Sequence, residues 1–397
     1  MPFSLYLLAM AVFAMGTSEF MLAGLVPDIA TSFGVSVAAS GILTSAFAVG
    51  MVVGAPLMAA LARRWPARTS LLSFLLAFAL MHVVGAVTTS FAILMATRVI
   101  AALANAGFLA VALSAAAALV PIDQKGRALA VLLSGTTVAT IAGVPGGALL
   151  GTSLDWRATF WAITLLCLPA AFGIMKAIPA DADVTSQHKP GPALRTEIAQ
   201  LATKRLALVM LIGALVNAGT FASFTFLAPI VTDTAGLGEL WISVALALFG
   251  FGSFVGVTVA GRLSDRRPSI VIRAGGPLLL LGWVALATLA GKPVALLLLV
   301  FVLGALSFAV GSTLIARVLY EAAGAPTMGG SYATSALNIG AAGGPVVAAA
   351  TLGSHASAVG PVWVSSLLVA LALLIAFPLL RFITPRSGQV IRYPHHS

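Results

Sequence analysis

The chain has 397 residues, of which 60% are hydrophobic and only 8% are charged. A soluble domain carries roughly 25% charged residues, so this chain cannot keep its apolar surface away from water by folding alone. The formal net charge of +10 would raise the question of nucleic-acid binding in a soluble protein. Here the basic residues are explained by membrane topology, so we expect no nucleic-acid partner.

Apolar segments long enough to cross a bilayer recur along the chain, since a crossing takes roughly 20 helical residues. The first six predicted helices span residues 5–29, 38–61, 69–87, 91–119, 128–152 and 157–178. After a polar stretch, six more span residues 206–230, 240–262, 270–290, 293–320, 329–352 and 358–381. The predicted fold is therefore an all-α integral membrane protein with twelve transmembrane helices.

The polar stretch divides the predicted helices into two six-helix bundles, residues 1–178 and 206–382. Residues 179–205 contain proline, glycine and both charge signs, which is typical of a linker. Its second part can form a short surface helix. Residues 383–397 form the predicted tail.

The distribution of Lys and Arg predicts the orientation, because basic residues are retained in short cytoplasmic loops. Eighteen of the 21 Lys and Arg residues fall in the linker, the tail and the loops on the same side. The opposite loops hold only Arg157 and Lys292, and Arg98 lies within a span. The sequence therefore predicts a multi-pass protein of the cell membrane with both termini in the cytoplasm.

The two halves are similar in sequence at a shift of about 202 residues, which is the mark of a duplicated transporter. AALARRWP at 59–66 aligns with GRLSDRRP at 261–268, and Pro27 aligns with Pro229. At a shift of 200, Pro145 aligns with Pro345.

The loop after the second helix of each half resembles that of the major facilitator superfamily, which carries a glycine, an acid and flanking arginines. GRLSDRRP supplies Gly261, Asp265 and Arg266, whereas the first copy keeps only Arg64 and Arg68 of this pattern. Charge-assisted hydrogen bonds of such a loop can hold neighbouring helices in one conformation and release them in another. A loop that only sets topology needs neither the glycine nor the acid, so we expect a conformational latch here.

The fifth predicted helix contains GVPGG, made of Gly143, Val144, Pro145, Gly146 and Gly147. It resembles the glycine-proline motif of proton-coupled exporters in this superfamily, although the order of residues differs. Small residues let helices approach closely, and proline removes a backbone hydrogen bond and bends the span. Close packing in any helical membrane protein is the alternative explanation.

Over nearly the whole chain the resemblance narrows to the drug:proton antiporter branch, and in particular to actinomycete chloramphenicol resistance exporters. The segments MGTSEFMLAGLVPDIA, TSAFAVGMVVGAPLMA, ATRVIAALANAGFLAVAL and GSTLIARVLYEAAGAPTMGGSYATSALNIGAA carry it. This resemblance implies antibiotic resistance by efflux of chloramphenicol or a similar drug through alternating access. Export of a sugar or another metabolite remains the alternative, because related sugar exporters share much of the pattern.

Two ionisable residues lie inside predicted spans, where a charge costs about 2.5–3.5 kcal/mol at the helix centre and is a candidate for function. Glu19 lies in the first helix and Arg98 in the fourth. Their depths from the outer surface are roughly 15 Å and 10 Å, so the side chains can meet if the helices are adjacent. A buried ion pair that only orients two helices is the alternative.

The superfamily resemblance implies that the first, fourth, seventh and tenth helices line a central cavity, so that both residues face it. A desolvated carboxyl group favours its neutral form and a nearby arginine opposes this, so a change in the pairing would couple proton uptake to export. We therefore expect Glu19 to be the proton-responsive residue and Arg98 its modulator. His82 in the third helix is a weaker proton candidate.

The drug cavity is expected to combine aromatic rings with a few amides, which suits an amphiphilic neutral molecule. The candidates on the cavity helices are Phe13, Phe20, Asn105, Asn217, Phe221, Phe224 and Asn338.

No cluster of His, Cys, Asp or Glu in the sequence indicates a metal or acid–base catalysis, so we expect neither a metal nor an enzyme. No phosphate-binding glycine loop appears, so we expect no cofactor, with the proton gradient as energy source. A sensor would need a signalling domain, which the sequence lacks. The expected partners are the drug, protons and the lipid bilayer, with the protein acting as a monomer.

Overall fold

The computed structural model describes residues 2–61, 66–121, 124–178, 194–264, 271–325, 328–352 and 358–383. Within these ranges the secondary structure is helical, and twelve helices are long and apolar enough to cross a membrane. The predicted all-α fold with twelve transmembrane helices is confirmed.

The N-terminal half contains six spans, and four of them have the expected bounds to within two residues. Its elements are α1 (Phe3–Phe20), α2 (Leu22–Phe33), α3 (Val37–Leu61), α4 (Ala67–Val87), α5 (Phe91–Ala118), α6 (Lys125–Val138), the π-helix η3 (Ala139–Gly143), α7 (Val144–Ser153) and α8 (Trp156–Ala177).

The C-terminal half follows a short helix that lies in the predicted linker. The elements from there on are α9 (Leu194–Ala199), the 3₁₀ turn η5 (Gln200–Ala202), α10 (Lys204–Phe224), α11 (Leu227–Pro229), η6 (Ile230–Thr234), α12 (Leu240–Ser264), η7 (Val271–Gly275), α14 (Gly276–Leu289), α15 (Pro293–Glu321), α16 (Gly329–Leu352) and α17 (Gly360–Ile383).

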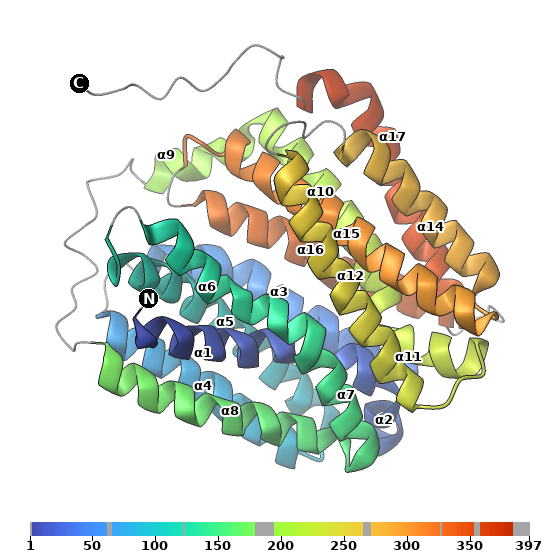
Figure 1. Ribbon diagram of the computed structural model, residues 1–397, viewed down its shortest axis with the longest axis horizontal. Coiled ribbons are helices and arrows are strands. Elements are labelled where there is room, and N and C mark those ends of the chain that lie inside the picture. Colours follow the sequence, from blue (N-terminus) through green and yellow to red (C-terminus); the bar gives the residue numbers. More distant parts are fainter. Residues whose placement is uncertain are drawn as a thin grey trace.

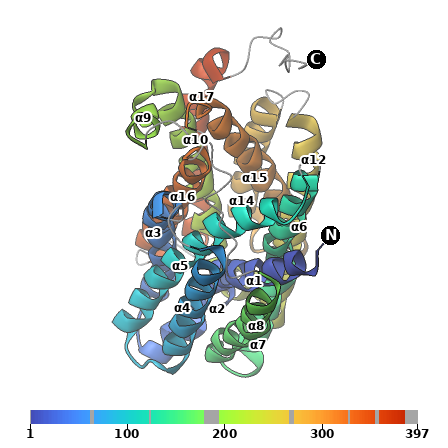
Figure 2. The same ribbon diagram turned by 90° about the vertical axis from the view of Figure 1, so that its left-hand side faces the viewer.

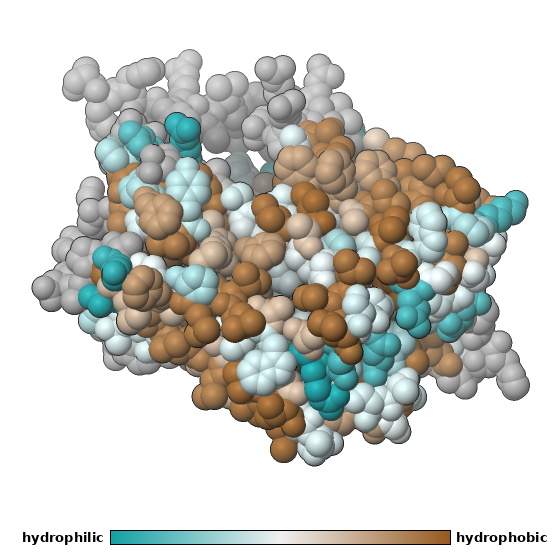
Figure 3. Space-filling model, turned by 60° about the horizontal axis from the view of Figure 1, so that its bottom comes forward, coloured by the Kyte–Doolittle hydropathy of each residue, from teal (hydrophilic) through white to brown (hydrophobic). Residues whose placement is uncertain are grey.

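The helices form two bundles, one from each half of the chain, as Figures 1 and 2 show. One cluster of buried apolar side chains consists entirely of residues before Ala199, and a second consists almost entirely of residues after it. Each half therefore has its own apolar core. Large apolar side chains cover much of the outside, as the brown areas of Figure 3 show, and Leu374 is 72% exposed. This surface suits contact with lipid.

Four predicted spans are divided rather than continuous. In one of them, 270–290, the π-helix η7 precedes α14. The predicted helix 5–29 is interrupted at Met21, and the predicted helix 206–230 is interrupted between Phe224 and Leu227. The predicted helix 128–152 contains η3, a single π-helical segment that ends two residues before Pro145. Proline has no N–H to donate to the preceding turn, which accounts for the break at this place.

The two halves contact each other along α3 with α16, along η3 and α7 with α12, and where α2 meets α11. Gly250 of α12 lies against the carbonyl group of Thr140 in η3, and Gly41 lies against the ring of Phe226. A buried cluster of Val26, Ala222, Phe226, Ala348 and Val364 joins the ends of α2 and α16 that the predicted orientation places outside. The structure is therefore closed between the halves on that side.

Candidate functional site

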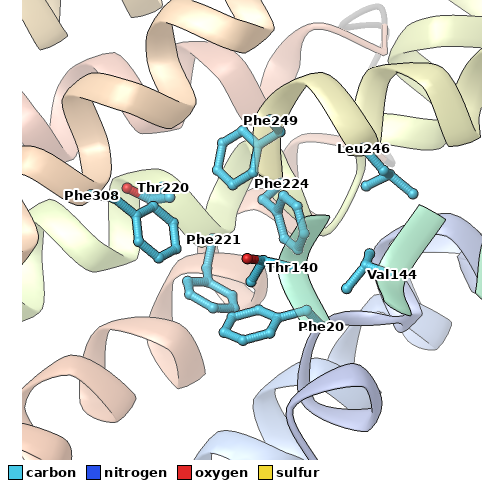
Figure 4. A pocket seen from close by; sticks show the side chains of 9 residues that line it. All are labelled: Phe20, Thr140, Val144, Thr220, Phe221, Phe224, Leu246, Phe249 and Phe308. Carbon is cyan, nitrogen blue, oxygen red and sulfur yellow. The ribbon is translucent and has the colours of Figure 1, made fainter. Parts of the chain in front are cut away.

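A small pocket lies between the two halves, next to the interruption of the first span. Nine side chains line it, three from the N-terminal half and six from the C-terminal half (Figure 4). They are Phe20, Thr140, Val144, Thr220, Phe221, Phe224, Leu246, Phe249 and Phe308. The pocket is thus assembled only when the halves come together.

Five phenylalanine rings form a continuous series along the pocket. Phe20 contacts Phe221 and Phe224 with centroid distances of 5.9 and 6.3 Å. Phe224 lies 4.7 Å from Phe249, which lies 6.1 Å from Phe308. These spacings fall in the range in which aromatic pairs attract each other.

The wall of the pocket offers almost no free hydrogen-bonding group. The hydroxyl groups of Thr140 and Thr220 donate to the carbonyl oxygens of Thr137 and Val216 on their own helices, at 2.9 and 3.1 Å. The pocket has a volume of only about 10 Å³, which is room for about one water molecule. A drug-sized ligand therefore requires the halves to move apart here.

The structure brings together three of the seven predicted cavity residues, namely Phe20, Phe221 and Phe224. The three amides make other contacts. Asn105 lies near the sulfur of Met51 at 3.7 Å, Asn217 donates to the carbonyl of Leu337 at 2.7 Å, and Asn338 donates to the carbonyl of Thr334 at 3.0 Å.

Phe13 is partly buried on α1 and does not line this pocket. Six lining residues were not among the candidates. Phe308 could have been found, because it lies on the tenth span, which was expected to line the cavity. Phe249 lies on the eighth span, and its role depends on packing between the halves that the sequence does not display.

Arg98 is buried in the N-terminal half, where it binds α1 through Ser18. Its Nη1 donates to the Ser18 hydroxyl at 2.8 Å, and its Nη2 donates to the Ser18 carbonyl oxygen at 2.7 Å. The guanidinium carbon lies 4.6 Å from the ring centroid of Phe47 on α3. Ser18 is in the last turn of α1, where carbonyl oxygens lack an intrahelical donor, so it can accept this bond.

Glu19, the residue after Ser18, is partly buried and interacts electrostatically with Arg98. Among the described residues, it makes no hydrogen bond and no ion pair within 4 Å with Arg98. The predicted pair thus interacts electrostatically without a direct bond, and Arg98 donates to Ser18 instead.

His82 belongs to the same buried cluster. Its Nε2 lies 2.7 Å from the Ser18 hydroxyl oxygen, and its Nδ1 lies 2.8 Å from the Phe78 carbonyl oxygen. His82 was expected to be the weaker proton candidate, and its contact with Ser18 of the first span could not be predicted from the sequence.

The GVPGG segment packs closely against α1 and α8. A side chain at Gly143 would meet Thr17, and one at Gly147 would meet Thr159 at 3.0 Å. Gly146 has nothing within 4 Å of such a side chain, and Pro145 lies in the first turn of α7. Gly143 and Gly147 therefore allow close packing, and Pro145 accompanies the π-helical break.

The predicted latch lies mostly outside the described residues, which include neither Arg64 nor Asp265 nor Arg266. Arg68 lies in the first turn of α4 and is partly buried. Gly261 lies in the last turn of α12.

Asp28 of α2 lies beyond the end of the first candidate span, near acidic groups of both halves. Burial, followed by the charges of Glu239 and Asp155, raises the pKa of Asp28 above its ordinary value. Glu239 precedes α12 of the other half, so these two carboxylates approach each other where the halves are closed.

We expect acidification to stabilise this closed arrangement. If opening separates the carboxylates, the closed form retains its full stability below the ordinary aspartate pKa of about 3.9. It loses stability as the pH rises from there through the raised pKa of Asp28, because charge then builds up between the halves. Spin-label distances between α2 and α12 should lengthen over this interval in the wild type. Asp28→Asn should remove the change, whereas the exposed Asp233→Asn should not; an unchanged response in Asp28→Asn would contradict the assignment.

Within the described part of the chain, no group of three or more His, Cys, Asp or Glu side chains could hold a metal ion.

Residues 8–345 match the family described as Major Facilitator Superfamily. The chain belongs to this superfamily. The family membership, together with the twelve membrane helices, makes it a multi-pass membrane protein of the cell membrane. The predicted family is confirmed.

Among its relatives, a "Chloramphenicol resistance protein" of Streptomyces lividans is 73% identical over 384 residues, covering 97% of this chain and 98% of the relative. The "Inner membrane transport protein YdhP" of Escherichia coli strain K12 is 30% identical over 380 residues, covering 94% and 95%.

Two solved structures share the fold at low sequence identity. A bacterial homologue of the human lysosomal transporter Spinster, described as inward-facing and unoccupied, has a TM-score of 0.70 at 15% identity and covers 96% of this chain and 95% of its own. The nucleoside transporter NupG has a TM-score of 0.76 at 14% identity, with coverage of 96% and 100%. Both support the two-bundle architecture.

Proposed function

We propose that this protein exports chloramphenicol or a similar drug across the cell membrane and thereby confers resistance to it. The observation that carries the proposal is the 73% identity, over nearly the whole of both chains, to a protein named for chloramphenicol resistance. The protein acts as a transporter rather than an enzyme. It works as a monomer in the lipid bilayer and has the proton gradient as its energy source.

The pocket between the halves supports this choice of substrate. Its series of phenylalanine rings suits the planar apolar part of an amphiphilic neutral molecule. Because both halves contribute side chains, a relative movement of the halves changes the space between the rings, as expected for alternating access.

Proton coupling is assigned to Glu19. Its carboxyl group is the acidic group in the first candidate span, and it lies beside a buried arginine whose charge acts on it. Protonation of Glu19 removes the attraction between these two side chains, and deprotonation restores it. A helix rearrangement that alters their separation would therefore change proton affinity, and by linkage proton binding would favour one arrangement.

The function can be tested by measuring chloramphenicol accumulation in sensitive cells that express the chain, with and without a protonophore. We expect expressing cells to accumulate less drug than cells with an empty vector, and the protonophore to abolish this difference. Equal accumulation in both cell types would refute export of this drug. A difference that persists with the protonophore would refute proton coupling.

Phe224→Ala should weaken drug recognition without preventing transport. Phe224 contacts three of the other rings of the pocket, so the substitution removes the ring with the most aromatic contacts there. We expect the apparent KM for the drug to rise roughly 3- to 10-fold, the scale of one or two aromatic contacts. Phe251→Ala is the matched control, because this ring is 54% exposed on the same half. Equal KM values for both variants would place the drug elsewhere.

A further inference from the structure

His82, Ser18 and Arg98 form a buried polar chain across three helices of the N-terminal half. Their exposed fractions are 1%, 0% and 1%, and two hydrogen bonds of 2.7 and 2.8 Å join them through one hydroxyl group. The rings of Phe78 and Phe160 flank the imidazole at 4.3 and 5.5 Å. This arrangement isolates the histidine from water and leaves Ser18 as its link to the arginine.

The hydrogen bonds determine which atoms donate. The Phe78 carbonyl oxygen can only accept, so Nδ1 of His82 carries a proton. In the neutral imidazole Nε2 is then an acceptor, and the Ser18 hydroxyl donates to it. The Ser18 oxygen in turn accepts from Nη1 of Arg98. The observed contacts therefore form a complete directional chain when His82 is neutral.

We propose that His82 is a second proton-binding residue, whose protonation transfers Arg98 from Ser18 to Glu19. A proton on Nε2 converts it from acceptor to donor, so the Ser18 oxygen would face two cationic donors. The serine hydrogen would also lose its acceptor. Repulsion between imidazolium and guanidinium in a poorly solvated site then drives Arg98 away from Ser18.

Glu19 is available as the new partner of the released arginine. Nε of Arg98 is buried and, among the described residues, has no hydrogen-bond acceptor. Glu19 follows Ser18 in the chain and already interacts electrostatically with Arg98. A small movement therefore replaces the bond to serine with an ion pair to the carboxylate, which uses the spare donors of the guanidinium.

The charged groups that act on this chain come from two helices. Arg98 of α5 acts on His82, and Glu19 of α1 acts on Arg98. The other neighbours are the uncharged Ser18 and two phenylalanine rings, one of them Phe160 of α8. A proton on His82 thus favours ionised Glu19, and a proton on Glu19 favours neutral His82. The two residues compete for one proton through Arg98.

This inference rests on the proposed role of Glu19 in proton coupling, but its first test does not depend on transport. Purified protein with ¹⁵N-labelled histidine is titrated by NMR, and His82→Gln identifies the signal. We expect the neutral ring to carry its proton on Nδ1. We also expect Glu19→Gln to move the titration midpoint of His82 by roughly one pH unit, as expected for charges that interact closely. Asp28→Asn should leave the midpoint unchanged.

A neutral ring protonated on Nε2 would overturn the proposal, as would a midpoint that Glu19→Gln does not move. If Glu19→Gln fails to fold, Arg98→Lys provides the second variant, because it removes the bidentate hold on Ser18 but keeps the charge. Its His82 midpoint should also differ from that of the wild type.

The second test measures pH-driven chloramphenicol export by wild type and His82→Gln in vesicles. Glutamine can accept from Ser18 and donate to Phe78 but cannot take up a proton, so it should hold Arg98 in place. We expect a loss of at least half of the pH-driven rate and a flatter pH profile, with drug binding to purified protein unchanged. A wild-type pH profile in the variant would overturn the proposal. Absence of pH-driven export by the wild type would refute the proposed function, while the NMR coupling would still decide the role of His82.

Discussion

Glu19→Gln should abolish export of the drug against its gradient. The amide keeps the size of the side chain but neither binds a transported proton nor attracts Arg98 as a carboxylate does. We expect resistance to fall to that of cells carrying an empty vector, a loss of roughly tenfold or more. A change of this size lies within the range that coupling free energies between two sites typically produce. Efflux from preloaded vesicles with and without an imposed pH difference provides the measurement.

Glu19→Asp is the conservative control, because it shortens the side chain and keeps the acid. It should retain a response to the imposed pH difference. Drug binding by purified Glu19→Gln protein shows whether the pocket remains intact. The role of Glu19 would be refuted if Glu19→Gln still exported drug uphill and still responded to pH.

Gly250→Ala should also have a large effect, through the contact between the halves. A methyl group at this position would meet the carbonyl group of Thr140 in η3, and backbone cannot swing aside as a flexible side chain can. Overpacking of this kind costs roughly 1–3 kcal/mol, which would shift the balance between closed and open forms about 5- to 150-fold towards the open form. Export should fall accordingly.

The measurement is the distance between spin labels on α2 and α12, which should lengthen in Gly250→Ala at constant pH. Gly343→Ala is the matched control, because a side chain there would have nothing within 4 Å. Thermal unfolding of both variants separates a shift between conformations from loss of folding. If Gly250→Ala kept the wild-type distance and transport rate, the close approach of η3 and α12 would have no role in the cycle.

The number and order of the spans could be predicted from the sequence, because apolar length decides whether a helix can cross the bilayer. The interruptions at Met21 and at η3 could not, since apolar composition continues through them. Proline is only a partial sequence signal for a break in a helix. Pro145 lies two residues after the end of η3, whereas Pro345 lies inside the unbroken α16. The surrounding packing decides whether a proline interrupts a helix.

Residues of the candidate site could be predicted from the sequence where their depth in the membrane and the order of their spans were enough to place them. Glu19 and Arg98 were found as charges within spans, and they are neighbours in the structure. The hydrogen bond of Arg98 to Ser18 could not be predicted, because serine occurs often in spans and carries no signal of its own. The same holds for the contact of Phe249 with Phe224, which depends on how α10 and α12 pack.

The two halves differ in the residues that they contribute to the buried polar chain and to the pocket. The buried polar chain lies wholly in the N-terminal half, while six of the nine pocket residues belong to the C-terminal half. Substitutions in the C-terminal bundle that alter the shape of the pocket therefore leave the residues of the proposed proton site unchanged. If the proposed function holds, such a division would let a lineage acquire resistance to new compounds while the proposed proton coupling is inherited unchanged.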